Sequence, residues 1–353
     1  MDKKTIILFA ISLAILGIML YWVGIDQVIN ALKTAKIEYI AIGFVMQIFT
    51  YYLYTLRWKI LNNLVGINMG IKKLFPMVLV GLAVNNITPS GRGGGEPVRA
   101  YLLSREGGYK MQDTFATVVA DRALDTFPFV VLAVFTIIGM AFSFKFNMGL
   151  LILMIVAVIA IIIILAIIIY MSINPAFGER VDGWIIGLVR RFYKKNTESL
   201  EEKIHSIISG FQDTMKMLIS NKTVLYYALP LSFVIWIFEI LRVYFIFLAF
   251  GARVTPIIIG EVFILASLAG MIPLLPGGIG AVDGIMVTFY SLAGITKTIS
   301  AAATIIERLI SFWMATIIGL VILPYYGSSV LDKISLGSTG EIEEAEEISE
   351  DES

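Results

Sequence analysis

Charged side chains interrupt several of the most apolar segments of this 353-residue chain. Charges inside a membrane-spanning segment are costly, so they usually face a bundle interior or a water-filled cavity and mark a functional site. For any one of them taken alone, a structural ion pair explains its presence equally well. The candidate substrate-binding residues are Glu96, Arg99, Asp121, Arg122, Asp125, Glu239, Arg242, Asp283, Glu307 and Arg308, with Arg92 nearby.

The spacing of these charges restricts which of them can pair. Adjacent residues of a helix do not face each other, so Asp121 cannot pair with Arg122, nor Glu307 with Arg308. Asp121 and Asp125 share a helix face and repel unless cations come from elsewhere. We therefore expect pairing between two halves of the chain, Asp121 with Arg308 and Glu307 with Arg122.

Two glycine-rich segments, 89–95 and 276–280, lie close to these charges in the sequence. Glycine permits positive φ angles and close backbone approach, so each segment predicts a turn between two short helices. Pro97 suits the first turn of a helix that starts near Glu96, and Asp283 suits the N-cap of its counterpart. The turn glycines are Gly91, Gly93, Gly94, Gly95, Gly277, Gly278 and Gly280.

Helix starts at these turns can bind anions, because their free N–H groups and positive dipole ends point toward the ligand. Arg92 and Arg99 add positive charge beside the first turn. Alternatively the glycines only allow tight helix packing, as small residues commonly do in membrane helices.

The elements that must carry these residues are transmembrane helices. Hydrophobic residues make up 58% of the chain and charged residues 15%, against roughly half and a quarter in soluble domains. Runs of about twenty apolar residues, such as 151–169, are long enough to span a bilayer. We predict an all-α polytopic membrane protein, with two interrupted regions, 74–105 and 257–294, forming re-entrant hairpins. The six predicted full spans are 5–24, 38–56, 114–141, 147–171, 224–250 and 301–325.

Several chemistries are disfavoured by the residue inventory. The chain has no cysteine, which excludes disulfides, thiolate catalysis and cysteine-ligated metals, and its one histidine is His205 in a charged stretch. A histidine-ligated metal and a Ser-His-Asp triad are therefore not expected. We expect no metal, no cofactor and no catalytic residue.

The basic residues predict orientation in the cell membrane. Lys3, Lys4, the charges after the second span (among them Arg57) and the basic loop 172–223 all become cytoplasmic if region 74–105 enters and leaves on one side. Both termini are then cytoplasmic. Apolar residues at helical spacing in 200–218 predict an amphipathic helix, either on the membrane surface or packed on the bundle. The acidic segment 326–353 is expected to be a disordered tail.

An internal repeat organises the predicted membrane domain, 1–325, into repeat one at about 38–141 and repeat two at about 224–325. The predicted topology inverts the two repeats, an arrangement typical of transporters with a site at the repeat interface. The matches, at offsets of 185 to 187, are Leu56-Arg57 with Leu241-Arg242, Gly66 with Gly251, 89–96 with 276–283, and Asp121-Arg122 with Glu307-Arg308.

Two segments resemble the signature blocks of the flippase-like family, also called the lysylphosphatidylglycerol synthetase transmembrane region. The first block is similar to 85–96 with Arg99 and 118–122, and the second to 273–280 with Asp283 and Glu307-Arg308. The family includes the membrane half of the bacterial multiple peptide resistance factor. The resemblance, which runs from about 5 to 325, implies lipid translocation between leaflets, without the soluble aminoacyl- or glycosyltransferase domains of some members.

The leading hypothesis is therefore a flippase for an anionic or polyprenyl-phosphate-type lipid. Arg122 and Arg308 would contact the headgroup, while Glu96, Asp121, Asp283 and Glu307 would hold the arginines and couple to protonation. The alternatives are a membrane-embedded transferase that acts on lipid-linked substrates, with Asp121 and Asp125 as possible metal ligands, and a non-catalytic scaffold. We expect membrane lipids, and no nucleic acid, as partners.

Overall fold

The computed structural model describes residues 25–88, 93–143, 148–174, 198–271 and 276–326, with a few residues between 176 and 187. The described part is almost entirely helical and contains no strand. The predicted span 5–24, together with Gly91, Arg92 and the acidic tail, lies outside it. Five helical segments are long and apolar enough to cross a membrane, and they match the other five predicted spans. They are Ile37–Leu64, Met111–Gly139, Ile152–Tyr170, Val224–Ala249 and Lys297–Tyr326.

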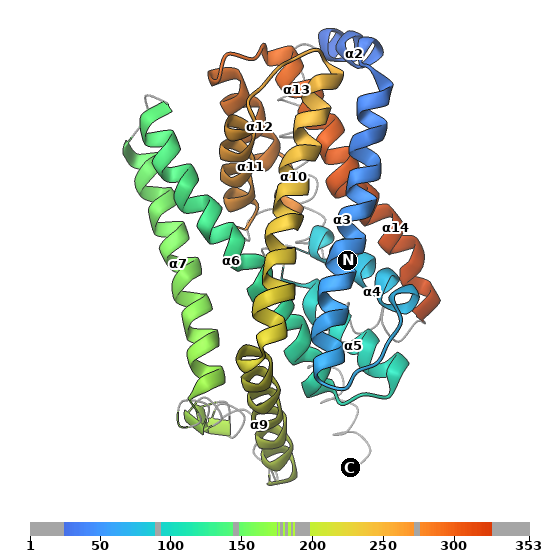
Figure 1. Ribbon diagram of the computed structural model, residues 1–353, viewed down its shortest axis with the longest axis vertical. Helices are drawn as coiled ribbons and strands as arrows, with labels where there is room; N and C mark the ends of the chain where they lie inside the picture. The colour runs from blue at the N-terminus through green and yellow to red at the C-terminus, as the bar shows by residue number, and fades with distance from the viewer. Residues whose placement is uncertain are drawn as a thin grey trace, which may run out of the picture.

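The described residues form twelve α-helices, which Figure 1 labels. They are α2 (Ile25–Thr34), α3 (Ile37–Leu64), α4 (Ile71–Ile87), α5 (Gly95–Gly107), α6 (Met111–Ser143), α7 (Met148–Ile173), α9 (Glu198–Ser220), α10 (Leu229–Ala249), α11 (Pro256–Gly270), α12 (Ala281–Leu292), α13 (Lys297–Arg308) and α14 (Met314–Ile322). Short π-helical turns, Val224–Ala228 and Leu309–Trp313, lead into α10 and join α13 to α14. Two 3₁₀ turns are Pro276–Gly278 and Leu323–Tyr326.

Both interrupted regions fold as two short helices joined at the glycine segment, as predicted. α4 packs against α5, and α11 packs against α12. Each pair also contacts the other half of the chain, because α4 packs against α14 and α11 packs against α6.

The centre of the bundle is the contact between α3 and α10, which run antiparallel (Figure 1). The N-terminal half of α3 reaches Arg242 through Gln47, whereas its C-terminal half reaches Ser232 through Arg57. Gly66 and Gly251, which follow these helices, have φ angles of 78° and 71°, a conformation that glycine adopts without a steric cost. The sequence match between these two glycines therefore reflects a shared way of ending a helix.

Arg57 is not a loop charge, and that part of the sequence interpretation was wrong. The predicted span ended at residue 56, but α3 continues to Leu64 and buries the Arg57 side chain, which is 1% exposed. A buried charge of this kind needs ionic partners, which the site supplies.

The peripheral helices differ in character. α7 is nearly all aliphatic and stands at the edge of the bundle (Figure 1), and most of its described side chains are exposed. α9, predicted as an amphipathic helix, packs against α6 and α7 and buries Met215 and Leu218. Its Phe211 ring lies 6.0 Å from that of Phe115. Of the two interpretations for this segment, packing on the bundle is therefore the one observed.

Candidate functional site

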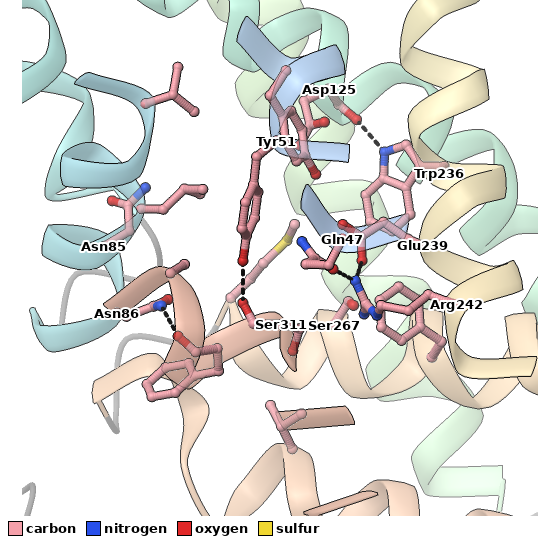
Figure 2. A pocket seen from close by; sticks show the side chains of 18 of the residues that line it. Gln47, Tyr51, Asn85, Asn86, Asp125, Trp236, Glu239, Arg242, Ser267 and Ser311 are labelled. Carbon is pink, nitrogen blue, oxygen red and sulfur yellow. Dashed lines mark hydrogen bonds and ion pairs between the residues drawn. The ribbon is translucent and has the colours of Figure 1, made fainter. Parts of the chain in front are cut away.

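A cavity of about 180 Å³ lies between the two halves of the chain and collects the charged residues singled out in the sequence. Figure 2 shows side chains from α3, α4, α6 and α10 converging on it. Arg92 lies outside the described residues, and Asp283 stands beside Arg308 without lining the cavity. The predicted residues on its wall are Glu96, Arg99, Asp121, Arg122, Asp125, Glu239, Arg242, Glu307 and Arg308.

Arg57 is the centre of the ionic network in the first half. Its Nε lies 2.7 Å from Asp121 Oδ1, and its Nη1 lies 3.1 Å from Asp125 Oδ1. Arg99 adds a second contact to Asp121, with Nη2 at 3.0 Å from Oδ2. Arg57 thus supplies the cation that the two aspartates on one face of α6 require.

Arg242 has the same role in the second half. Its guanidinium contacts Glu239 on its own helix and lies 2.8 Å from Glu307 Oε1. Arg308 points away from this pair: its Nε lies 3.2 Å from Asp283 Oδ1, and its Nη2 donates to the Gly277 carbonyl oxygen at 2.9 Å.

The predicted pairing between the halves, Asp121 with Arg308 and Glu307 with Arg122, is wrong. Each buried acid is bound by the arginine of the central helix in its own half, Arg57 or Arg242. Arg122 and Arg308 instead each face an acid near the start of the second short helix in their own half. Arg122 Nε lies 3.8 Å from Glu96 Oε1 of α5, and Arg308 Nε contacts Asp283 of α12 in the corresponding way. The physical reason is that the central helices lie closer to the acids than the opposite half does.

Hydrogen bonds do cross between the halves, and they join corresponding positions. The Tyr51 hydroxyl donates to the Ser311 carbonyl at 3.2 Å, and the Trp236 indole donates to the Asp125 carbonyl at 3.1 Å (Figure 2). Tyr51 and Trp236 are 185 residues apart, and Asp125 and Ser311 are 186 apart.

The arginines of the two central helices, α3 and α10, also form hydrogen bonds from one half of the chain to the other. Arg57 Nη1 donates to Ser232 Oγ at 3.0 Å, and Arg242 Nη1 donates to Gln47 Oε1. Gln47 and Ser232 are again 185 residues apart. The residues that the sequence interpretation missed at the cavity include Gln47, Tyr51, Arg57 and Trp236.

The first glycine turn is built on close backbone contact. A Cβ on Gly95 would overlap the Gly81 carbonyl oxygen and lie 2.7 Å from its carbon. The Gly95 N–H donates to Asn85 Oδ1 at 2.6 Å. Gly94, in contrast, has φ −76° and ψ −22°, angles that any residue adopts, so Gly95 is the position that requires glycine.

The second turn uses positive φ angles instead. Gly277, Gly278 and Gly280 have φ angles of 56°, 66° and 84°. The prediction that Asp283 is the N-cap of the second short helix is wrong. Asp283 lies at the third position of α12, where its Oδ2 accepts a hydrogen bond from the Gly280 N–H at 2.7 Å. It closes the helix start from inside, and its other oxygen binds Arg308.

Arg122 is the cation most available to a ligand in this cavity. Its side chain is 36% exposed, and its two ion pairs, to Glu96 and Asp125, are both 3.8 Å long. Arg308 is 9% exposed and makes shorter contacts. Glu96 Oε2 and Arg99 Nε are buried atoms without a hydrogen-bond partner among the described residues. These groups can accept and orient a small polar or charged ligand.

Aromatic rings lie against four of the cavity arginines, and the contacts to Arg99 and Arg308 are the closest. The Arg99 guanidinium lies 4.2 Å from the centre of the Trp58 ring, and that of Arg308 lies 4.3 Å from the Phe312 ring. Such cation–π contacts hold the guanidinium plane in place. Within the described ranges, no group of three or more His, Cys, Asp or Glu side chains is arranged to hold a metal ion.

A charged cavity inside a bundle with five candidate membrane spans defines a polytopic helical membrane protein. The chain belongs to the family described as the lysylphosphatidylglycerol synthase TM region, whose model matches residues 6–319. A UPF0104 membrane protein of Methanothermobacter thermautotrophicus is 50% identical over 95% of this chain and 99% of its own length. A UPF0104 membrane protein of Methanocaldococcus jannaschii is 33% identical over 90% of this chain and 94% of its own. A more distant relative is glycosyltransferase AglD of Haloferax volcanii, which is 22% identical; the matched region covers 98% of this chain and 57% of that protein.

Proposed function

We propose that this protein moves a phosphate-bearing lipid, anionic or of the polyprenyl-phosphate type, between the two leaflets of a membrane. The observation that carries the proposal is the cavity: five arginines and five carboxylates meet inside a bundle whose outer helices are apolar. Charges at this position are expensive unless they serve a polar substrate or its path.

The proposal includes an inverted repeat with the cavity at its interface, as in many secondary transporters. Its support is the set of exchanged contacts, in which Tyr51 and Trp236, and Gln47 and Ser232, occupy equivalent places. The antiparallel packing of α3 and α10 is what a two-fold axis in the membrane plane requires. The two helix pairs with glycine turns then enter the membrane from opposite sides as re-entrant hairpins.

The polar headgroup binds in the cavity while the lipid tails stay outside the bundle. About 180 Å³ is smaller than the roughly 300–1,000 Å³ of pockets that enclose a whole small molecule. Arg122 contacts the phosphate first, because it is the most accessible guanidinium, and Arg308 contacts it once its bond to Gly277 opens. Asp121 and Glu307 keep Arg57 and Arg242 in place.

A membrane-embedded transferase is the second candidate, favoured by the distant match to a glycosyltransferase. It predicts that purified protein changes a lipid-linked substrate chemically. The third candidate is a non-catalytic membrane scaffold. It predicts that the charged residues of the cavity can be replaced without loss of the protein's function in the cell.

The test is reconstitution of the purified protein in liposomes that contain a fluorescent phosphate-bearing lipid. Transport predicts that a membrane-impermeant quencher removes the fluorescence of lipid that began in the inner leaflet only when the protein is present, because the protein moves this lipid to the outer leaflet, and that chromatography recovers the lipid unchanged. A chemically altered lipid supports the transferase, and protected inner-leaflet lipid contradicts transport.

A further inference from the structure

Glu261 is a buried carboxylic acid that belongs to neither ionic network. It lies on the second turn of α11, is 5% exposed, and makes no ion pair with any residue in the described part of the chain. Its Oε2 is buried without a hydrogen-bond partner there. The proposed transport site does not use it.

The carboxyl group lies in the contact between α11 and α6, opposite Gly139. A Cβ at position 139 would overlap Glu261 Oε1 and lie 3.3 Å from the carboxyl carbon, so the glycine leaves the space that the acid fills. Ile258 and Leu265, which lie one turn before and after Glu261 on the same face of α11, contribute to the main apolar cluster, as does Ala133 of α6. The side chains next to Glu261 on this face are therefore apolar.

The charges on the neighbouring helices are engaged elsewhere. Asp113 accepts a bond from Thr214, and the remaining charged residues on the described parts of these helices form the cavity networks. Two further basic residues lie near the ends of these helices in the sequence. Lys145 follows α6 but lies outside the described residues, and Arg253 comes before the start of α11 at Pro256. The titratable groups on the helices that pack against α11 are Asp113, Asp121, Arg122 and Asp125 on α6, Tyr170 on α7, Glu239, Arg242 and Tyr244 on α10, and Asp283 and Tyr290 on α12.

The equivalent contact in the other half, between α4 and α14, has no such acid. Position 76 of α4, which corresponds to 261 at an offset of 185, is Pro76. A Cβ on Gly319 of α14 would overlap the Leu79 carbonyl oxygen and lie 2.9 Å from its carbon, so backbone closes this contact. The fold can thus make the contact without a carboxyl group, which points to a role for Glu261 other than packing.

We propose that Glu261 is a proton-binding site, and that its protonation couples the proposed lipid movement to a proton gradient. An ionised carboxylate without a counter-charge is strongly disfavoured in an apolar contact, whereas the neutral acid is tolerated. Glu261 therefore binds one proton while α6 and α11 are closed. It releases that proton only when the contact opens to water. Because Phe263, Ala266 and Ser267 of the same helix line the cavity, this opening changes the headgroup site.

The coupling rests on the proposed function, but the proton site can be tested independently of it. Infrared spectra of the purified protein in H₂O and D₂O should contain a protonated carboxylic acid band at neutral pH that Glu261→Gln removes. Glu38→Gln, which changes an exposed acid on α3, is the matched control and should leave the band in place. Gly139→Ala should shift the band, because the added methyl group displaces the carboxyl group. Identical spectra for wild type and Glu261→Gln overturn the proton site.

The coupling is tested in liposomes with an imposed pH gradient. Reversing the gradient should change the rate of lipid movement at least several-fold in wild type and leave it unchanged in Glu261→Gln. If the rate of lipid movement by wild type does not depend on the pH gradient, the coupling is overturned even if the infrared band is present. If wild type moves no lipid under any gradient, the proposed function and the coupling both fail, while the infrared result still decides whether Glu261 binds a proton.

Discussion

Replacing Gly95 by alanine should separate the two helices of the first glycine turn. Its Cβ would stand 2.7 Å from the Gly81 carbonyl carbon and 3.0 Å from the Gly81 Cα, whereas ordinary contact begins at 3.4 Å. Both neighbouring atoms are backbone, so no side chain can rotate away. α5 must therefore move away from α4 by at least several tenths of an ångström.

The cost follows from overpacking, which typically destabilises a core by about 1–3 kcal/mol. Alanine in place of a helical glycine returns about 0.5–1 kcal/mol, so we expect a net loss of about 1–2 kcal/mol. The displacement carries Glu96 and Arg99 with it, and the 3.0 Å contact between Arg99 and Asp121 lengthens. Misplacement of binding groups on this scale should reduce lipid movement at least tenfold.

Gly284→Ala is the matched control, because a Cβ at that helical position meets nothing within 4 Å. Thermal unfolding in detergent, followed by tryptophan fluorescence, should show a Tm lowered by a few degrees for Gly95→Ala and unchanged or raised for Gly284→Ala. Wild-type stability and lipid movement in Gly95→Ala would refute the claim that the close approach of α4 and α5 shapes the site.

The ionic networks and the topology support further predictions. Arg57→Ala should lower the free energy of unfolding by about 3–5 kcal/mol, because only Arg99 and Arg122 then face the three acids of this network and one buried negative charge is left uncompensated; denaturant unfolding at wild-type concentrations would contradict this. Arg122→Ala should leave stability within about 1 kcal/mol of wild type and abolish binding of a phosphate headgroup, since its ion pairs are long and partly exposed. Arg308→Ala should instead lower the Tm, and equal Tm values for both variants would show that the two arginines are equally engaged. Cysteines at Lys195 and Glu344 should react with an impermeant reagent only after membrane permeabilisation, and labelling in intact cells would contradict cytoplasmic termini and loop.

The sequence predicted the five spans that the structure describes and nine of the ten charged residues on the cavity wall, because both depend on local composition. Charges within apolar runs were costly enough to identify Asp121, Arg242 and Glu307 without any knowledge of the packing. The glycine segments likewise predicted the breaks between α4 and α5 and between α11 and α12.

The ion pairs could not be predicted from the sequence. Periodicity indicates which residues share a face of a helix, but it does not indicate which other helix packs against that face. Arg57 was placed in a loop since the span was ended at the first charge. Its match with Arg242 in the repeat was the signal that could have placed it in the core. Tyr51 and Trp236 gave no signal, because aromatic residues are common in membrane helices and their bonds go to backbone carbonyls. Gly95 could not be distinguished from Gly94, since only the position of Gly81 separates them.

The most direct test of the central claim is the rate at which a fluorescent phosphate-bearing lipid crosses liposomes that contain wild type, Arg122→Ala or an exposed-residue control, Lys72→Ala. We predict rapid movement with wild type and with Lys72→Ala. With well-folded Arg122→Ala we predict a rate close to that of protein-free liposomes. Equal rates for wild type and Arg122→Ala would show that the charged cavity is not the path of the headgroup.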